Sequence, residues 1–473
     1  SSSGSHAFQS GACAPSSLKP MLASFTPEVP GALQGGSLWE RLKVQPPWGK
    51  ASMDIRRFPD RGLGWIACQP VKEGDIIQSM PLTDILAAPE GPDSEAELAA
   101  CLLQVHGEGP RFDGAPGAEP VDEVWQAYTE AAFPQTPAAP VLTWSQADIE
   151  ALEYPPVVEL FKKYSDHLLK SAESVAEYTG ASLARATWAV NAVVSRSFSI
   201  DGIGRSLVPL ADLFNHKPMT RATWSARHLK NPSYPVTPWH LSPDRQRLEI
   251  QAMEPVDAGE EVTLCYGEET SAEVLAVHGY IPADNDADYV TLFRTPADLV
   301  ERVGQLIGCA HSMKPRLLRL EAATNAGASL AVGLGGIPTA AHLLSSIELA
   351  LAEELEFAEF HEVHCIEVGH SILAPADSLP ARRRQELRSQ AIMVAARVVD
   401  DALKHMTAAS ADEEKIARLQ AELAAEVPAE IASGMEKALL AAKFRLGVKL
   451  ILTNFLKEAN DLNIPGRGGR RLE

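Results

Sequence analysis

The sequence predicts an α+β protein, because β-rich and helical segments occupy different parts of the chain. Residues 37–89 and 207–267 contain short runs of alternating apolar and polar residues separated by turns, which is typical of strands. Residues 90–190 and 297–460 instead carry apolar residues at helical spacing. We therefore expect a β-rich domain that is interrupted by a helical insertion and followed by an all-α C-terminal domain.

The first β-rich segment is expected to be a meander of short strands. The run "MDIRRF" alternates, "DRGLGW" forms a tight turn, and "WIACQPV" resumes extended structure before "KEGD" turns the chain again. The second segment predicts a hairpin with a longer loop, since "DAGE" separates two alternating runs. These runs contain Leu248, Ile250 and Ala252, and then Val262, Leu264 and Tyr266.

The helical segments are defined by apolar stripes and by prolines. Pro-rich breaks at 134–140 and 155–156 divide the insertion. The last helix carries two stripes, so we expect it to be buried on both sides. One stripe holds Ile431, Met435, Leu439, Ala442, Leu446 and Leu450, and the other holds Phe444, Val448, Ile451 and Phe455. A further C-terminal stripe holds Leu344, Ile347, Leu351 and Leu355.

Composition and charge exclude several classes of function. The net charge of -20 over 473 residues argues against a nucleic-acid binder but suits a basic peptide substrate. The six cysteines form no CxxC pair or disulfide framework, which indicates a reducing compartment. The sequence contains no run of about 18 apolar residues, so we expect no membrane-spanning segment. The run "HEVHCIEVGH" at 361–370 lacks the HExxH spacing, so we expect a solvated helix face and no metal.

Two segments combine glycines or polar residues with otherwise apolar surroundings. Gly62-Leu63-Gly64 would let backbone groups approach a ligand closely, the alternative being a plain turn. The segment "SLVPLADLFNHK" places Asp212, Asn215 and His216 in a stretch that otherwise reads as buried. An adjacent Asn and His can form hydrogen bonds with an adenine edge or with the headgroup of an amino acid. The alternative interpretation is a core histidine that caps a loop.

Arg196 and Tyr266 are two further candidates. Arg196 lies near the end of a helical stretch, in "SRSF", where its permanent charge would hold a carboxylate; the alternative is an ordinary surface ion pair. Tyr266 ends an alternating strand next to a glycine, where it is a candidate functional residue. The alternative is a structural tyrosine of the core or its rim, whose hydroxyl forms a hydrogen bond with the backbone.

Taken in order, these motifs resemble the SET-domain protein methyltransferases, in the branch of the Rubisco large-subunit lysine methyltransferases. "RGLGWIACQPVKEGDII" resembles the first SET motif, and "WQAYTEAAFPQTPAAPVLTWSQADIEALE" is similar to the helical segment inserted in that branch. "SRSF" and "LVPLADLFNH" resemble its cofactor segment, and "GEEVTLCYGEETSAEVLAVHGY" its closing tyrosine motif. The C-terminal helical range resembles the substrate-binding domain of the branch.

The resemblance implies a fold, a cofactor and roles for single residues. It implies a SET fold with a pseudoknot, in which the Asn215-His216 segment threads near the closing tyrosine motif, as an exception to the rule against knotted connections. It also implies S-adenosyl-L-methionine as cofactor, and Tyr266 as the catalytic residue at the methyl-transfer channel. The implied cofactor-binding residues are Gly62, Leu63, Gly64, Arg196, Asp212, Asn215, His216 and Tyr266.

One departure from the branch concerns the substrate. Where the branch has a tyrosine after the closing motif, this chain has His278 in "HGY", with Tyr280 close by. Related enzymes that methylate histidine have Asn where this chain has Phe198, and an aromatic wall there favours a lysine stem. The implied substrate-binding residues are thus Phe198, His278 and Tyr280. Histidine methylation, or an inactive SET-fold protein that only binds a partner, are the alternatives.

The expected organisation follows from these motifs. A SET domain would span 37–290, with its insertion at about 90–190, and a helical substrate-binding domain would span 291–460. We assign residues 1–36 and the tail 461–473 to neither domain, and we expect residues 1–36 to be a disordered or targeting segment. We expect a monomer that acts on a protein, with Rubisco large subunit, an aldolase, a ribosomal or a histone protein as candidates. The expected location is the chloroplast or the cytoplasm, with the nucleus as a third option.

Overall fold

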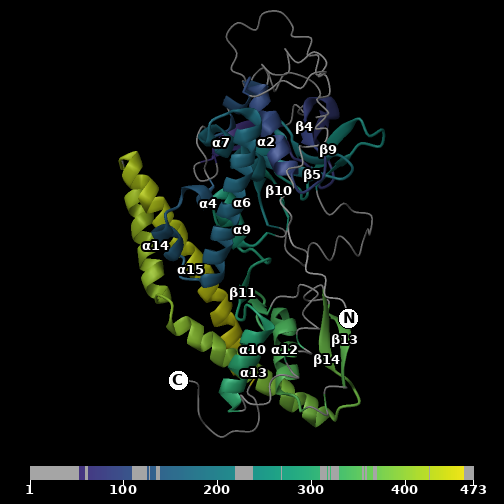
Figure 1. Cartoon of the computed structure of the whole chain (residues 1–473), viewed down its shortest axis with the longest axis vertical. Coiled ribbons are helices and arrows are strands. Elements are labelled where there is room, and N and C mark those ends of the chain that lie inside the picture. Colours follow the sequence, from purple (N-terminus) through teal and green to yellow (C-terminus); the bar gives the residue numbers. More distant parts are fainter. Residues whose placement is uncertain are drawn as a thin grey trace, which may run out of the picture. The chain divides into compact units, whose positions relative to one another are not determined.

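The computed structural model divides the chain into two compact units (Figure 1). The first unit comprises residues 1–138, 166–215 and 235–264, and the second comprises 139–165, 216–234 and 265–473. The residues that the structure describes are 53–58, 62–108, 125–126, 128–130, 132–134, 139–218, 238–267, 269–308, 317, 320, 330–353, 356, 359–365, 370–425 and 427–462. The predicted segment 1–36, most of the tail and Leu355 lie outside the described residues.

The first unit contains three small sheets, apart from His216, which belongs to the second unit, and the helices of the predicted insertion outside residues 139–165. One sheet has the order β1 (Met53–Phe58), β2 (Gly62–Ala67), β10 (Glu261–Leu264) and β7 (Asn215–His216). The others have the orders β3 (Ile76–Pro81), β9 (Arg247–Gln251), β8 (Trp239–Leu241), and β4 (Leu86–Ala88), β6 (Gly204–Leu207), β5 (Ser197–Ile200). Helix α2 (Ser94–Val105) packs on α7 (Leu183–Arg196) and on β4 and β6.

The predicted strands are present, but their pairing differs from the expected hairpin. The residues Leu248 and Ile250 are fully buried in β9, which pairs with β3 and β8. The run that contains Val262 instead forms β10, which pairs with β2. Alternation therefore located both strands correctly, whereas the hairpin between them was wrong.

The second unit is built mainly from helices. Its helices include α4 (Pro140–Thr143), α5 (Gln146–Glu150), the first part of α6 (Pro155–Thr179), α9 (Ser271–His278), α10 (Pro296–Ile307), α12 (Ala341–Leu351), α13 (Ala381–Lys404), α14 (Ala409–Leu423) and α15 (Ala429–Asp461). Helices α14 and α15 run side by side (Figure 1). Capping boxes start α9 at Thr270 and α10 at Thr295, and glycines with positive φ, Gly279 and Gly308, end them.

The expectation that the C-terminal region is entirely α-helical was wrong. Two β-hairpins interrupt it, β11 (Tyr289–Thr291) with β12 (Ala331–Gly333), and β13 (Phe360–Cys365) with β14 (His370–Pro375). The run 361–370, expected as a solvated helix face, supplies most of β13 and the first residue of β14. A short run of mixed polar and apolar residues does not by itself separate a strand from a helix.

The last helix is buried mainly along one of its two predicted stripes. Phe444, Val448, Ile451 and Phe455 are all buried, as expected. In the other stripe Ile431 is 57% exposed and Leu450 is 53% exposed, so burial on both sides was wrong for these positions. None of the described helices combines the length and apolar character that a membrane crossing requires.

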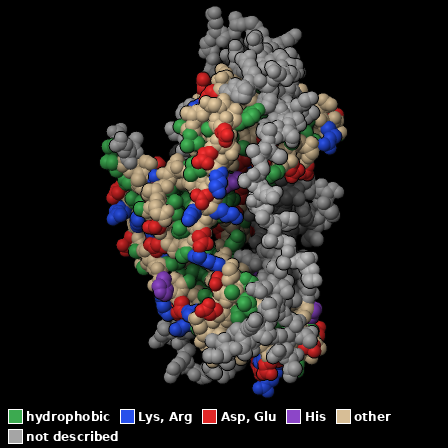
Figure 2. Space-filling view, viewed as in Figure 1, with side chains coloured by type: hydrophobic (Ala, Val, Ile, Leu, Met, Phe, Trp, Pro, Cys, Tyr) green, Lys and Arg blue, Asp and Glu red, His purple; other side chains and the backbone are tan. Residues whose placement is uncertain are grey.

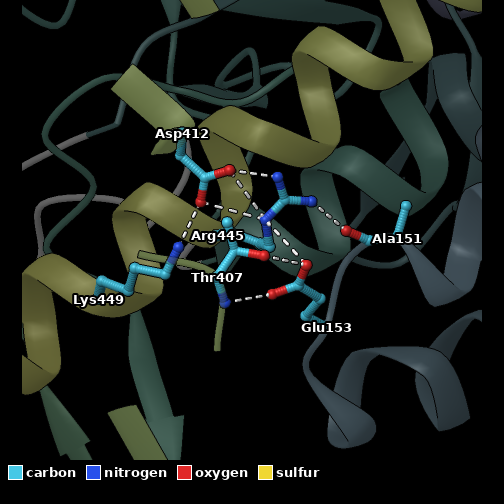
Figure 3. Close-up of polar contacts among 6 residues, drawn as sticks. All are labelled: Ala151, Glu153, Thr407, Asp412, Arg445 and Lys449. Atoms are coloured by element: carbon cyan, nitrogen blue, oxygen red, sulfur yellow. Dashed lines mark hydrogen bonds and ion pairs between the residues drawn. The ribbon is translucent and has the colours of Figure 1, made fainter. Parts of the chain in front are cut away.

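A buried ionic cluster joins three segments of the second unit (Figure 3). Asp412 of α14 pairs with Arg445 and Lys449 of α15, and all three side chains are at most 4% exposed. Arg445 also donates to the carbonyl of Ala151, and Glu153 lies 3.7 Å from its Nε. The cluster therefore ties the two C-terminal helices to the turn between α5 and α6.

Candidate active site

The loop between β6 and β7 is fixed by three side chains from distant parts of the first unit. Trp65 Nε1 donates to the carbonyl of Leu210 at 2.8 Å, and Gln78 Nε2 donates to the carbonyl of Pro209 at 3.1 Å. The hydroxyl of Tyr128 accepts a hydrogen bond from the Leu210 N–H at 2.8 Å. Leu210 has a φ of 67°, which is unfavourable for a leucine, so these bonds hold a strained turn in place.

The same loop carries Asp212, which is paired with Arg196. The Arg196 NH1 donates to Asp212 Oδ2 at 2.8 Å, and the Asp212 side chain is only 2% exposed. The Tyr128 hydroxyl donates to the other carboxylate oxygen. Arg196 also donates to the carbonyl of Ala132 and stacks on the ring of Phe133. Its strongest partner is thus a protein carboxylate, and its predicted role in holding a cofactor carboxylate stays a prediction.

Burial governs the ionisation of this network. It raises the pKa of the Asp212 carboxyl, although Arg196 and the Tyr128 hydroxyl oppose the shift. Burial and the neighbouring Asp212 also raise the pKa of Tyr128 well above its usual value. The phenol therefore stays protonated at neutral pH and remains a hydrogen-bond donor.

The glycine motif contacts Asn215 directly. Asn215 Nδ2 donates to Glu261 Oε1 at 2.7 Å and to the carbonyl of Leu63 at 3.4 Å. The chain reverses between Phe58 and Gly62, since β1 and β2 pair antiparallel, and Gly62, with a φ of 77°, is the first residue of β2. The expected turn therefore directly precedes the glycine motif, and the glycines themselves lie in the strand. A Cβ added to Gly64 would lie 2.5 Å from Asn215 Nδ2, so the glycine is required for the close approach of this side chain.

Replacing Gly64 with Ala is expected to lower the free energy of unfolding by about 1–3 kcal/mol, because the new methyl group displaces Asn215. Chemical denaturation measures the loss. The matched control is Gly91→Ala, where a Cβ meets open space and the stability should not fall. Equal stability of the Gly64 variant and the wild type would contradict the packing argument.

The second unit contains the remaining candidates, which form an aromatic row. The Tyr266 N–H donates to His216 Nδ1 at 3.0 Å, and their rings lie 4.9 Å apart. The Tyr266 ring is 5.3 Å from that of His278, which in turn is 6.4 Å from that of Tyr280. Glu269 lies 3.8 Å from His278 Nε2, and burial, with Glu273 nearby, raises the pKa of Glu269.

The structure thus gathers the predicted site residues into two groups. Within the first unit, Arg196 and Asp212 are paired, and Asn215 contacts Leu63 between the two glycines. Within the second, His216 and Tyr266 are bonded. Because Asn215 and His216 are consecutive, the chain itself links the groups, and their convergence on one pocket stays a prediction.

Phe198 packs differently from the other candidates. Its side chain is buried, and its ring meets that of Trp239 edge-on at 5.0 Å. Trp239 Nε1 in turn donates to the carbonyl of Ser199. The ring therefore has a clear packing role within the first unit, while its contact with a substrate stays a prediction.

Sequence analysis missed the residues that hold the site in place. Trp65, Gln78 and Tyr128 each bond to the loop that precedes Asn215, and Glu261 accepts a hydrogen bond from the Asn215 side chain. Nothing in periodicity distinguishes them from ordinary core or surface residues, because their partners lie far away in the sequence. Among the described residues, no group of three or more His, Cys, Asp or Glu is placed to hold a metal ion.

Comparison with solved structures gives extensive similarity of fold at low sequence identity. The SET domain of LSMT bound to lysine and AdoHcy matches with a TM-score of 0.54 and 16% identity, covering 88% of each chain. The same domain bound to methyllysine and AdoHcy matches at 0.55 and 14%, covering 90% of this chain and 92% of that one. Rubisco LSMT bound to AdoMet matches at 0.53 and 14%, with the same coverage.

Comparison with protein-family models agrees with this fold. Residues 62–267 match the family model of the SET domain, a range that begins at the first glycine of the motif and ends next to Tyr266. A comparison with curated proteins gave no match. Residues 62–267 are therefore similar to the SET domain, and the chain has the fold of the Rubisco LSMT structures.

Proposed function

We propose that this protein transfers a methyl group from S-adenosyl-L-methionine to the side-chain amine of a lysine in a protein substrate. One observation carries the proposal. The residues that the SET motifs single out are physically connected, through Arg196–Asp212 and Leu63–Asn215 in one unit and His216–Tyr266 in the other. The similar solved structures, which hold AdoMet, AdoHcy or lysine, support the same cofactor and substrate class.

The polar groups around Asn215 fit the amino-acid end of the cofactor. Both Nδ2 hydrogens of Asn215 are used, whereas its Oδ1 receives no hydrogen bond from the described residues. That oxygen is available to accept from the cofactor's α-ammonium group. Arg196 uses two of its five N–H donors in the described contacts, which leaves donors for a carboxylate.

Transfer requires a neutral amine that is aligned with the methyl group. When bound, S-adenosyl-L-methionine supplies an electrophilic methyl on a sulfonium. With a lysine pKa of about 10.4, forming the neutral amine near pH 7 costs about 4–5 kcal/mol, which a dry and narrow channel lowers. Tyr266 would orient the amine through its hydroxyl and ring, and the His278 and Tyr280 rings would enclose the stem. Most of the acceleration would come from alignment.

The substrate and its residue can be identified directly. The full chain is incubated with isotope-labelled S-adenosyl-L-methionine and a cell extract, and labelled peptides are sequenced by mass spectrometry. The proposal expects the label on lysine side chains. A label on histidine would replace the lysine assignment, and cofactor binding without any labelled protein would favour a SET-fold protein that only binds a partner.

Replacing Tyr266 with Phe is expected to lower turnover about 10²-fold while leaving the dissociation constant for the cofactor nearly unchanged, because only the hydroxyl that orients the amine is lost. Steady-state rates and cofactor titration separate the two effects. Tyr178→Phe, a half-buried tyrosine of α6, serves as the matched control and should keep full activity. Full turnover in the Tyr266 variant would remove this residue from the mechanism.

A further inference from the structure

The second unit contains a pocket whose lining combines apolar and acidic groups. It lies between the first turn of α9, the loop from α9 to β11, the start of α6 and the middle of α15. Its apolar lining includes Val157, Leu160, Phe444 and Val448. The first turn of α9 belongs to the closing tyrosine motif, but the proposed chemistry assigns no role to the residues that line this pocket.

A glycine in the middle of α15 keeps one wall of the pocket open. Gly447 lies one turn after Lys443 and one turn before Ile451, and all three line the pocket. A glycine in a helix interior costs about 0.5–1 kcal/mol relative to alanine. A Cβ at Gly447 would meet nothing within 4 Å, so no contact with the protein requires glycine here. Any larger side chain at this position would project into the pocket.

The rim of the pocket exposes large apolar side chains to solvent. Tyr289 is 46% exposed and Leu450 is 53% exposed, and both line the pocket. Isolated exposed apolar residues are common, but two that flank an apolar cavity are typical of a surface that buries a partner side chain.

The polar lining is predominantly acidic. Glu273, Asp284 and Asp288 line the pocket together with a single basic residue, Lys443. Within the described part of the chain, none of the three carboxylates lies within 4.0 Å of a basic side-chain nitrogen. Glu273 is held by the Thr270 N–H at 2.8 Å, and Asp288 by the Ser271 hydroxyl at 2.6 Å. In these contacts the partners of Glu273 and Asp288 are therefore neutral groups.

Charge crowding near the pocket favours a cationic ligand. Burial raises the pKa of Asp288, and the Glu273 carboxylate adds to the shift. The whole chain carries a net charge of -20, although acidic and basic side chains are mixed on the face shown in Figure 2. A basic group that entered the pocket would relieve this repulsion.

We infer that this pocket is a docking site for a segment of the protein substrate that presents a large apolar side chain beside a lysine or arginine. The apolar side chain would enter next to Gly447, and the basic group would face Asp284 and Asp288. Assigning the segment to the substrate rests on the proposed function, whereas the chemistry of the pocket does not.

Helix α9 sets the distance between the docking pocket and Tyr266, the residue proposed to act in methyl transfer. Its first residue, Ser271, lines the pocket, and its last residue, His278, contacts the Tyr266 ring. Seven helical steps span about 10 Å, which an extended peptide covers in about three residues. The docking residue is therefore expected roughly three to five residues away from the methylated lysine.

The test measures binding without catalysis. The probe is a fluorescein-labelled peptide, Gly-Lys-Leu-Lys-Gly-Gly, titrated with the full chain and followed by fluorescence anisotropy at low salt. Gly447→Leu should weaken binding at least about tenfold by filling the pocket. The matched control, Gly434→Leu, changes an exposed glycine of the same helix that also faces open space, and should alter binding less than about twofold.

Two further measurements test the charge of the pocket and the apolar side chain of the peptide. Asp284→Asn, which keeps a residue that tolerates the observed φ of 50°, should weaken binding about threefold and flatten its salt dependence. A peptide with Ser in place of Leu should bind at least about tenfold more weakly. Equal binding of the two peptides, no binding at millimolar concentration, or unchanged binding by the Gly447 variant would each overturn the docking site. Failure of methylation alone would overturn only the proposed function.

Discussion

Replacing Asp412 with Ala is expected to lower the free energy of unfolding by about 3–5 kcal/mol. The variant leaves Arg445 and Lys449 side by side without their shared carboxylate, and both side chains are only 4% exposed (Figure 3). Chemical denaturation measures the loss. Glu414→Ala, an exposed position on the same helix, is the control and should stay within about 0.5 kcal/mol of wild type.

The stability that the Asp412 carboxylate contributes should decrease as the pH falls. Burial opposes ionisation of Asp412, but hydrogen bonds from Arg445 and Lys449 outweigh it and lower the pKa of this carboxyl in the folded state. Burial likewise opposes ionisation of Glu153, and hydrogen bonds from Thr407 lower its pKa. A lowered folded-state pKa contributes stability above the unfolded pKa and loses it as pH falls through the folded value.

The stability difference between wild type and Asp412→Asn should therefore be largest near neutral pH and shrink below about pH 4. Denaturation at several pH values measures this trend. Glu153 has a φ of 53°, so the turn that it occupies is strained, and the network with Thr407 and Arg445 holds it there. A difference that does not vary with pH would show that the ionised carboxylate is not what stabilises the cluster.

The second large effect is expected at Asp212. Asp212→Ala removes the carboxylate that pairs with Arg196 and accepts from Tyr128, and the Asp212 side chain is 2% exposed. We expect a loss of about 3–5 kcal/mol in the free energy of unfolding and weaker cofactor binding, because the loop before Asn215 loses its anchor. The control Asp201→Ala, at an exposed turn, should change neither quantity.

A milder variant, Tyr128→Phe, separates the contribution of the Asp212 charge from the contribution of the hydrogen bond that positions Leu210. Tyr128→Phe keeps the Arg196–Asp212 pair but leaves the N–H of the strained Leu210 without its acceptor. It should cost about 1–3 kcal/mol, less than Asp212→Ala. If Tyr128→Phe were the more costly of the two, the carboxylate would not be the centre of this network.

The order of elements along the chain could be predicted, whereas much of their pairing could not. Alternation at Leu248 and Ile250 correctly identified a strand, because these side chains are buried on one face. The partner of that strand, β3, lies more than 160 residues earlier in the sequence, and no local pattern encodes such a choice. The same limit explains why the expected hairpin with β10 does not form.

The two stripes of α15 illustrate a related limit. A helix that is apolar on several sides does not reveal which side its neighbours will cover, so Phe444 and Leu450 look alike in the sequence although only the first is buried. The motif residues could be singled out in the sequence, since Arg196, Asn215 and Tyr266 bring polar groups into largely apolar stretches, and their roles in the site stay predictions. Their supports, such as Tyr128, were not predictable, because their role exists only through contacts made by the fold.

The central proposal is that this chain binds S-adenosyl-L-methionine through the segment that holds Asn215, and calorimetric titration of the full chain with S-adenosyl-L-methionine tests it most directly. We expect one bound molecule per chain, at least about tenfold weaker binding in Asn215→Ala, and unchanged binding in the exposed control Asp257→Asn. A wild-type chain that does not bind the cofactor, or an Asn215 variant that binds it as tightly as wild type, would contradict the claim.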